Sequence, residues 1–207
     1  MELLFIFCGS FILGLSGAIV PGPLFTVTIG ETTRRGVWTA PLLISGHALC
    51  EFLMIIALVL GVGPVLQNET MFRIVSVVGG SILLWMSYGL FKAPSQLEAT
   101  QNVSPKDTNL VWLGVLLTLT NPHWVVWWAT IGVKGIMESL ATAGLLAVVS
   151  FGLGHVLSDY LWYVLVGVTL GLGKDRLTPR FLRGIQLFCA LALVFLGGYF
   201  IIDGLRF

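Results

Sequence analysis

Six long runs of apolar residues, separated by short polar stretches, make up most of the chain. They lie near residues 3–29, 37–62, 70–91, 110–133, 140–172 and 181–205. A helix needs roughly 20 residues to cross about 30 Å of hydrocarbon, and each run is long enough. Because continuous apolar runs of this length are typical of membrane spans, the pattern predicts an all-α integral membrane protein with six transmembrane helices.

The composition agrees with a membrane protein. The chain is 57% hydrophobic and only 10% charged, whereas soluble domains are roughly 25% charged. Eleven Lys and Arg residues nearly balance ten Asp and Glu residues, so we expect the lipid bilayer and no nucleic acid as a partner. The three cysteines lie in apolar runs without a C-x-x-C motif, and we predict neither a redox pair nor a bound cofactor.

The charges of the connections predict the orientation of the chain. Connections after the first, third and fifth runs carry eight basic residues, and the opposite side carries three. The positive-inside bias then places the odd-numbered connections in the cytoplasm and both termini outside, in the cell (inner or plasma) membrane. The longest connection, residues 93–109, is polar and contains proline, so we expect it to divide the chain into halves at 1–92 and 110–207.

The two halves repeat each other. Residues 46–53 (GHALCEFL) in the second run correspond to residues 154–161 (GHVLSDYL) in the fifth run. Three spans per half is an odd number, so the second half must enter the bilayer upside down. Inverted repeats of this kind are typical of secondary transporters, whose binding sites lie at the repeat interface near the midplane.

Proline interrupts the first and the fourth run near their midpoints, at Pro21-Gly22-Pro23 and at Asn121-Pro122. Broken backbone inside a bilayer is tolerated mainly where protein buries it or where it lines a polar cavity. Each restarted helix presents free N–H groups and the positive end of its dipole, which together suit a carboxylate. A plain proline kink in a membrane helix is the alternative.

We take residues at and after these breaks as candidate substrate-binding residues: Pro21, Gly22, Pro23, Thr26, Asn121, Pro122, His123 and Trp128. Carbonyls that lose their helical partners are expected to accept from a substrate ammonium group, namely those of Gly17, Ile19 and Thr118. We expect the aromatic cluster of the fourth and fifth runs to pack the helices or to form an interfacial belt, with the lining of a substrate passage as the alternative. Its members are Trp124, Trp127, Trp128, Trp162 and Tyr163.

His47 and Glu51, like their counterparts His155 and Asp159, are four residues apart and share one helix face near the middle of a span. Ionisable groups at that depth are costly and usually face a partner or a cavity. As candidate ion-coupling residues they could relay protons, bind a cation or a substrate ammonium group, or merely join the halves by hydrogen bonds. One histidine and one carboxylate per helix is a weak pattern for a metal site, so none is predicted.

With these residues in place, the chain resembles the lysine exporter (LysE/RhtB) family of amino-acid efflux carriers. The likeness covers nearly the whole length and rests on Pro21-Gly22-Pro23, Gly36, the Gly46 region, Gly79-Gly80 before Tyr88-Gly89, and Asn121-Pro122. It implies export of amino acids from the cytoplasm, driven by an ion gradient. The chain departs from the family pattern at His47, where many members have aspartate, and at His123, where lysine is frequent.

We therefore predict a secondary transporter, an antiporter that exports an amino acid or a similar small zwitterion, coupled to a proton or sodium gradient. A divalent metal-ion exporter is the alternative function. No nucleophile is paired with a base, so we predict no enzyme. Gly167 and Gly171 would allow two helices or two subunits to approach closely, and a homodimer is considered for that reason.

Overall fold

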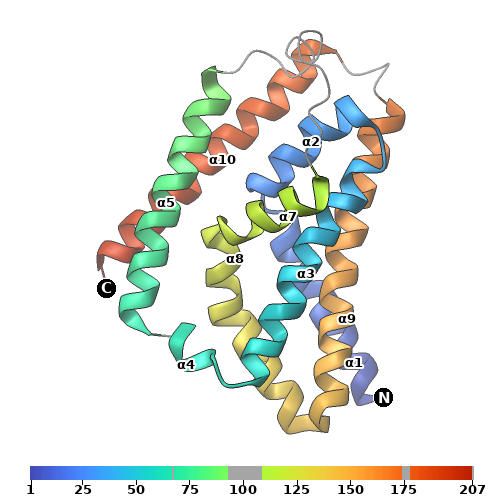
Figure 1. The fold of residues 1–207 in the computed structure, drawn as a ribbon, viewed down its shortest axis with the longest axis vertical. Helices are drawn as coiled ribbons and strands as arrows, with labels where there is room; N and C mark the ends of the chain where they lie inside the picture. The colour runs from blue at the N-terminus through green and yellow to red at the C-terminus, as the bar shows by residue number, and fades with distance from the viewer. Residues whose placement is uncertain (67, 93–108, 174–177, 207) are drawn as a thin grey trace.

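The computed structural model describes residues 1–66, 68–92, 109–173 and 178–206, and all regular structure within these ranges is helical (Figure 1). The prediction of an all-α protein is confirmed for these residues. The helices are α1 (Glu2–Ala18), α2 (Pro23–Arg35), α3 (Thr39–Val59), α4 (Gly63–Leu66), α5 (Glu69–Lys92), α7 (Leu110–Leu119), α8 (Pro122–Trp127), the π-helix η1 (Trp128–Gly132), α9 (Val133–Gly173) and α10 (Pro179–Arg206). Apart from Asn109, the predicted connection at 93–109 lies outside the described residues.

Among the described residues, four helical stretches are long and apolar enough to cross a membrane: α3, α5, the stretch Pro122–Gly173, and α10. Helices α1 and α2 meet at a bend of 75° and would form a fifth span if taken together. The predicted break at the first proline motif is thus confirmed, whereas the total of six spans stays a prediction.

The stretch Pro122–Gly173 turns back on itself within α9 (Figure 1). Ala143 (φ −148°, ψ 27°) and Gly144 (φ 64°, ψ −147°) are not helical. We predicted that the fourth run ends at residue 133, which is wrong, because the helix continues to Thr142. The turn requires a positive φ, which glycine adopts at little cost and which Gly144 supplies.

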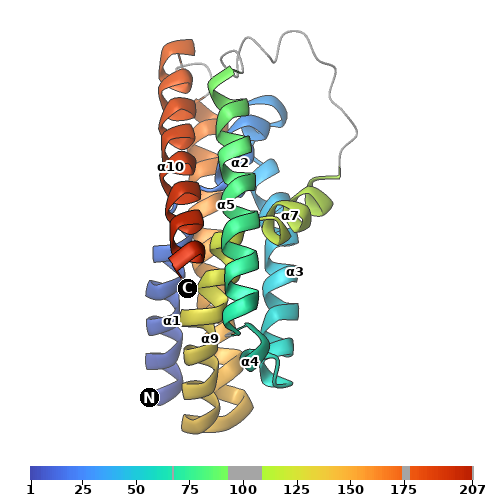
Figure 2. The same ribbon diagram turned by 90° about the vertical axis from the view of Figure 1, so that its left-hand side faces the viewer.

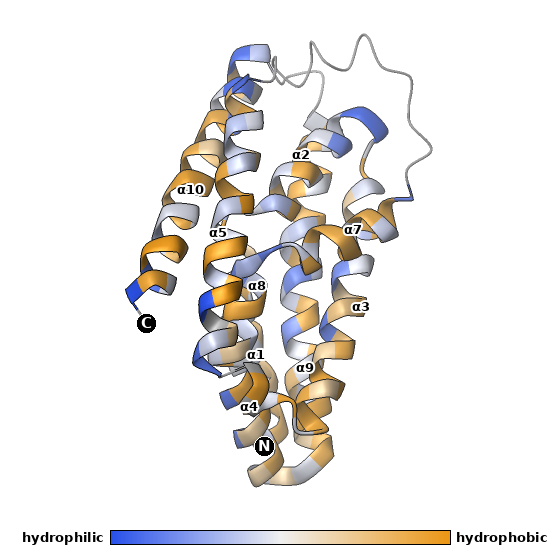
Figure 3. Ribbon diagram, turned by 60° about the vertical axis from the view of Figure 1, so that its left-hand side comes forward, coloured by the Kyte–Doolittle hydropathy of each residue, from blue (hydrophilic) through white to orange (hydrophobic). Residues whose placement is uncertain are grey.

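The helices alternate in direction (Figures 1 and 2). In Figure 1, α1 and α2 rise, α3 descends, α5 rises, and α7 and α8 descend. The part of α9 after Gly144 then rises and α10 descends, so both termini lie in the lower half of the view. Figure 3 shows hydrophobic residues along most of this length, with hydrophilic residues at the ends of α2 and α10 and within α3 and α9.

The packing of α1 on α9, and of α3 on α7, joins the two halves of the chain. A Cβ on Gly154 would collide with the carbonyl oxygen of Phe7, and a Cβ on Gly46 would collide with that of Val111. These two glycines occupy equivalent places in the sequence repeat. Each therefore allows the first helix of the opposite half to pack closely: Gly154 contacts α1, and Gly46 contacts α7.

Helices α5 and α10 pack along each other on one side of the molecule (Figure 1). The pair meets the other helices chiefly at α8, where Gly79 packs against the ring of Pro122. Gly167 and Gly171 of α9 allow close packing within the chain. A Cβ on Gly167 would collide with Ala40, and a Cβ on Gly171 would collide with Val37. A homodimer stays a prediction.

Candidate functional site

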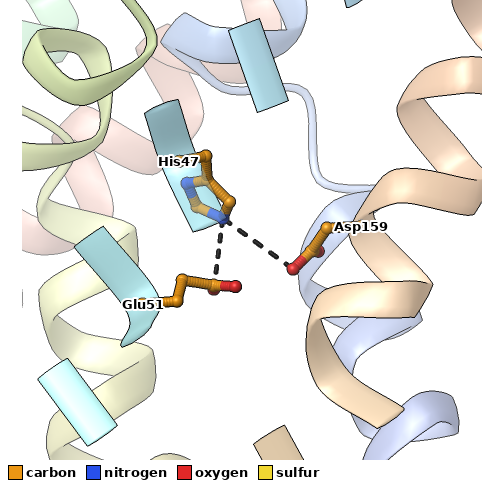
Figure 4. Close-up of side chains that lie close together, drawn as sticks. All are labelled: His47, Glu51 and Asp159. Atoms are coloured by element: carbon orange, nitrogen blue, oxygen red, sulfur yellow. Dashed lines mark ion pairs between the residues drawn. The ribbon is translucent and has the colours of Figure 1, made fainter. Parts of the chain in front are cut away.

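The two His/carboxylate pairs of the sequence repeat meet in the interior, where α3 faces α9. Figure 4 shows three of the four side chains, His47, Glu51 and Asp159. His155 Nε2 lies 2.8 Å, and His47 Nε2 3.1 Å, from the same oxygen, Glu51 Oε1. Asp159 Oδ2 lies 3.8 Å from His155 Nε2 and 3.9 Å from His47 Nε2. Both carboxylate residues are buried, Glu51 with 1% and Asp159 with 4% of its surface exposed. The structure thus brings all four candidate ion-coupling residues into one cluster, which we call the charge cluster.

Hydrogen-bond directions around His47 show where one proton of the charge cluster lies. Thr118 Oγ1 donates its only proton to the carbonyl of Gly114 (2.7 Å). It must then accept from His47 Nδ1, which lies 2.9 Å away. With Nδ1 protonated, the contact between His47 Nε2 and Glu51 needs a further proton, on the imidazole or on the carboxyl group.

The ring of His155 is enclosed by aromatic side chains. Trp127 stacks on it with ring centroids 4.4 Å apart, and Trp128 meets it edge-on at 5.2 Å. Trp124, Trp127 and Trp128 are all buried. For these three residues the predicted packing between helices is confirmed. All three also line the cavity described next, and the alternative that they line a substrate passage stays a prediction.

The charge cluster lines a cavity with a volume of ≈ 50 Å³ for the centres of water-sized molecules. At about 10–15 Å³ for each water, this is room for about four waters. Five of the candidate substrate-binding residues also line the cavity: Gly22, Pro23, Asn121, His123 and Trp128. The other three do not: Thr26 donates its hydroxyl to the carbonyl of Gly22 (3.0 Å), Pro122 packs against Gly79, and Pro21 lies outside the lining.

At both helix breaks, the N-terminal end of the helix that follows the break lies at this cavity: α2 at the first break and α8 at the second. Gly22 is extended (φ −111°, ψ −172°) and α2 begins at Pro23 without a side-chain cap. The N–H groups of Leu24 and Phe25 precede the first bond of α2, so no carbonyl of that helix satisfies them. At the second break, Asn121 Oδ1 accepts from the N–H of His123 (3.1 Å), which confirms the predicted N-cap.

The carbonyls expected to be free at the breaks are mostly occupied. The carbonyl of Gly17 accepts from the N–H of Val20 (3.2 Å), and that of Thr118 accepts from the N–H of Asn121 (3.0 Å). These two carbonyls have lost the regular bond to the fourth residue along, as predicted, and the last turn of each helix tightens and recovers a bond to the third residue. Acceptance from a substrate ammonium group stays a prediction for them. The role of the Ile19 carbonyl stays a prediction.

Several buried polar atoms of cavity-lining residues have no hydrogen-bond partner among the described residues. They are Nε1 of Trp124, Trp127 and Trp128, Nδ1 of His155, Oε2 of Glu51 and Oδ2 of Asp159. Buried polar groups are nearly always hydrogen-bonded, so donors and acceptors left over around one cavity indicate a bound polar species. Sequence reasoning missed the three indole N–H donors, although their crowding just after Asn121-Pro122 was visible.

Comparison with known proteins identifies the family. Residues 15–204 match the family described as LysE type translocator. The chain belongs to that family. This LysE translocator is also 20% identical, over 204 residues and 97% of each chain, to a Bacillus subtilis (strain 168) protein named "Putative amino acid efflux protein YcgF". No solved structure matches it. The resemblance that rests on the proline motifs is thereby confirmed, and membership makes the protein a membrane transporter.

Proposed function

We propose that this LysE translocator exports a small amino acid from the cytoplasm in exchange for an ion, with a proton favoured over sodium. The observation that carries the proposal is that two helix N-termini and the charge cluster share one buried cavity. A zwitterion needs donors for its carboxylate and acceptors for its ammonium group, and this cavity offers both. The efflux function in the name of the Bacillus subtilis relative agrees with this substrate class.

The architecture that we propose is six spans arranged as two inverted three-helix repeats, in the plasma membrane with both termini outside. The turn at Ala143 and Gly144 supports it, because it separates a fourth span from a fifth within α9. The equivalent contacts of Gly46 and Gly154 support the repeat, since a two-fold axis in the membrane plane would relate them.

The substrate carboxylate would bind at the restarted ends of α2 and α8, where backbone N–H groups and two helix dipoles converge. Among the described residues, those that line the cavity include neither lysine nor arginine, so we assign the neutralisation of the carboxylate to these helix ends. The ammonium group would bind at Oε2 of Glu51 and Oδ2 of Asp159, two buried carboxylate oxygens of cavity-lining residues that have no hydrogen-bond partner among the described residues.

The chemistry of the charge cluster supports a proton as the coupling ion. The contact between His47 and Glu51 holds one proton, as the bond from Thr118 to Gly114 requires. An ammonium group that arrives beside Glu51 and Asp159 would supply positive charge in place of that proton. Substrate and proton would then occupy the cluster alternately, which is the condition for exchange of one against the other.

A divalent metal ion is the second candidate substrate. His47, Glu51 and Asp159 each offer one ligand atom, and the three atoms lie within 4.8 Å of one another. Nitrogen and oxygen ligands of this kind suit Zn²⁺ or Mn²⁺. This candidate does not use the helix ends or the indole N–H groups, which is why we rank it second.

Counterflow in proteoliposomes tests the proposal. Vesicles loaded with an unlabelled amino acid should accumulate the same amino acid in radiolabelled form, and uptake into protein-free vesicles should be absent. Titration calorimetry with amino acids and with Zn²⁺ or Mn²⁺ separates the two candidates. Binding of a metal ion without exchange of any amino acid from a full panel would show that the proposed function is wrong.

A further inference from the structure

One wall of the cavity is entirely apolar. From the α5–α10 pair, three residues line it, and all are leucines: Leu83 of α5 and Leu193 and Leu196 of α10. Leu83 and Leu193 have 1% and 0% of their surface exposed. They belong to one hydrophobic cluster, against which Leu196 and Val126 pack. This leucine wall presents no hydrogen-bonding side chain to the cavity.

The polar groups of the cavity come from the other helices. The charge cluster belongs to α3 and α9, the uncapped N–H groups to the start of α2, the Asn121-capped helix end to α8, and the indole donors to α8 and η1. If the carboxylate of a bound amino acid contacts the helix ends and its ammonium group contacts the charge cluster, its α-carbon lies between these polar groups. Other apolar lining residues lie around the first break, where the carboxylate would bind: Gly14, Gly17, Ala18, Val20 and Leu24. The side chain would therefore extend toward the leucine wall on the opposite pair of helices.

We infer that the cavity selects amino acids with an unbranched or small branched aliphatic side chain, which packs on Leu83, Leu193 and Leu196. The inference rests on the proposed function and names its substrate class. A side chain with a terminal charge is rejected, because it would leave water for an apolar surface that offers no counter-charge. Both carboxylates of the cavity already face the histidines and the substrate ammonium group.

A homologous series of substrates tests the inference. Alanine, 2-aminobutyrate, norvaline and norleucine differ by one methylene each, and their competition against labelled alanine counterflow gives relative affinities. Each methylene buried on the leucine wall should improve affinity about threefold to fourfold until the wall is covered. Norleucine and lysine form the matched pair, since they share one carbon chain and lysine adds an ammonium group. Lysine should bind at least about tenfold more weakly than norleucine.

A variant of the leucine wall tests whether its residues cause the dependence of affinity on chain length. Leu193→Ala should flatten the dependence of affinity on chain length, so that norleucine loses more affinity than alanine does. Leu193→Met, which conserves volume, should restore the dependence. Leu191→Ala is the control, because Leu191 lies on the same helix with 60% of its surface exposed.

The outcomes separate the inference from the proposed function. If no amino acid exchanges, the proposed function is wrong. If amino acids exchange but affinity does not rise with chain length, or lysine binds as tightly as norleucine, the leucine wall does not select the side chain. Equal weakening of alanine and norleucine by Leu193→Ala would likewise overturn the inference, because the leucine would then serve only the contact between α5 and α10.

Discussion

Glu51 contacts a histidine from each of the two halves of the chain. Its Oε1 atom lies within 3.1 Å of a histidine nitrogen of its own half and 2.8 Å of one from the other half. Replacing a buried partner of such a network leaves the others unsatisfied, so each member affects more than one contact. Glu51 therefore bonds the two halves to each other, which is one of the roles that the sequence left as alternatives, and its role in carrying a proton stays a prediction.

The role of Glu51 in coupling can be tested with an amide. Glu51→Gln keeps the shape of the side chain and one accepting oxygen but cannot titrate. We expect uptake driven by a pH gradient to fall at least about tenfold, while exchange of substrate at equilibrium stays within a few-fold of wild type. Asp159→Asn should act in the same direction. Both activities are measured in the same proteoliposomes.

Glu138→Gln is the matched control, because the Glu138 side chain is 68% exposed and pairs only loosely with Lys134, at 3.8 Å. It should leave both activities unchanged. If Glu51→Gln reduces gradient-driven uptake and equilibrium exchange equally, Glu51 binds substrate or holds the fold and does not carry the coupling proton.

At this scale the sequence predicts identities better than contacts. The four members of the charge cluster could be named because the repeat matches His47 with His155 and Glu51 with Asp159. The contact between Glu51 of one half and His155 of the other could not be predicted, because it depends on how α3 packs on α9. The sequence also could not predict that the indole N–H groups lie at the cavity, because that depends on how the helix after Asn121 is oriented.

Among the elements, the broken helices are the ones that proline chemistry predicts directly. Both breaks occur where proline removes a backbone donor, and the bend of 75° at the first break follows. The end of the fourth run was harder to place, because residues 134–142 are compatible with either a helix or a connection. The residue that places the turn is Gly144, because the turn requires a positive φ there.

The helix ends at the breaks can be tested by letting one helix run on. Pro122→Ala should allow α7 and α8 to join, which would consume the N–H groups of the restarted helix. We expect binding of the amino acid to weaken at least about tenfold while the protein still folds. Asn121→Ala removes only the cap, worth about 1 kcal/mol, and should weaken binding about fivefold.

The measurement is titration calorimetry with an amino acid and with its amide analogue, which lacks the carboxylate. Both variants should reduce the preference for the amino acid over the amide. Pro179→Ala serves as the control, since Pro179 also begins a helix but lies outside the cavity lining. Binding by Pro122→Ala that is as tight as wild type would show that the restarted end does not hold the carboxylate.

For the whole molecule, the distribution of packing suggests how access could alternate. Helices α1, α3, α7 and α9 hold one another through close contacts at Gly46 and Gly154, whereas α5 and α10 meet the rest chiefly at α8. The cavity lies between these two groups, with the charge cluster on one and the leucine wall on the other. A small rotation of the α5–α10 pair would change the exposure of the cavity without disturbing the charge cluster.

Cysteine labelling tests the six-span topology on which this arrangement depends. Single cysteines are placed at Ser95, at Thr142 and at the C-terminus of a variant in which Cys8, Cys50 and Cys189 are replaced. An impermeant reagent should label Thr142→Cys and the C-terminal cysteine from outside and Ser95→Cys only from the cytoplasmic side. The physical reason is the excess of eight basic residues over three on the cytoplasmic side, together with an odd number of spans in each half.

The cysteine at Thr142 decides between two topologies of the stretch Pro122–Gly173. If the turn at Ala143 and Gly144 connects two spans, Thr142 lies at the membrane surface and is labelled. If the stretch crosses the membrane only once, Thr142 lies among lipid tails and stays unlabelled, and the C-terminus moves to the side of Ser95. Labelling of Ser95→Cys and the C-terminal cysteine from the same side would therefore overturn the six-span arrangement, and with it the inverted repeat that brings α2 and α8 to one cavity.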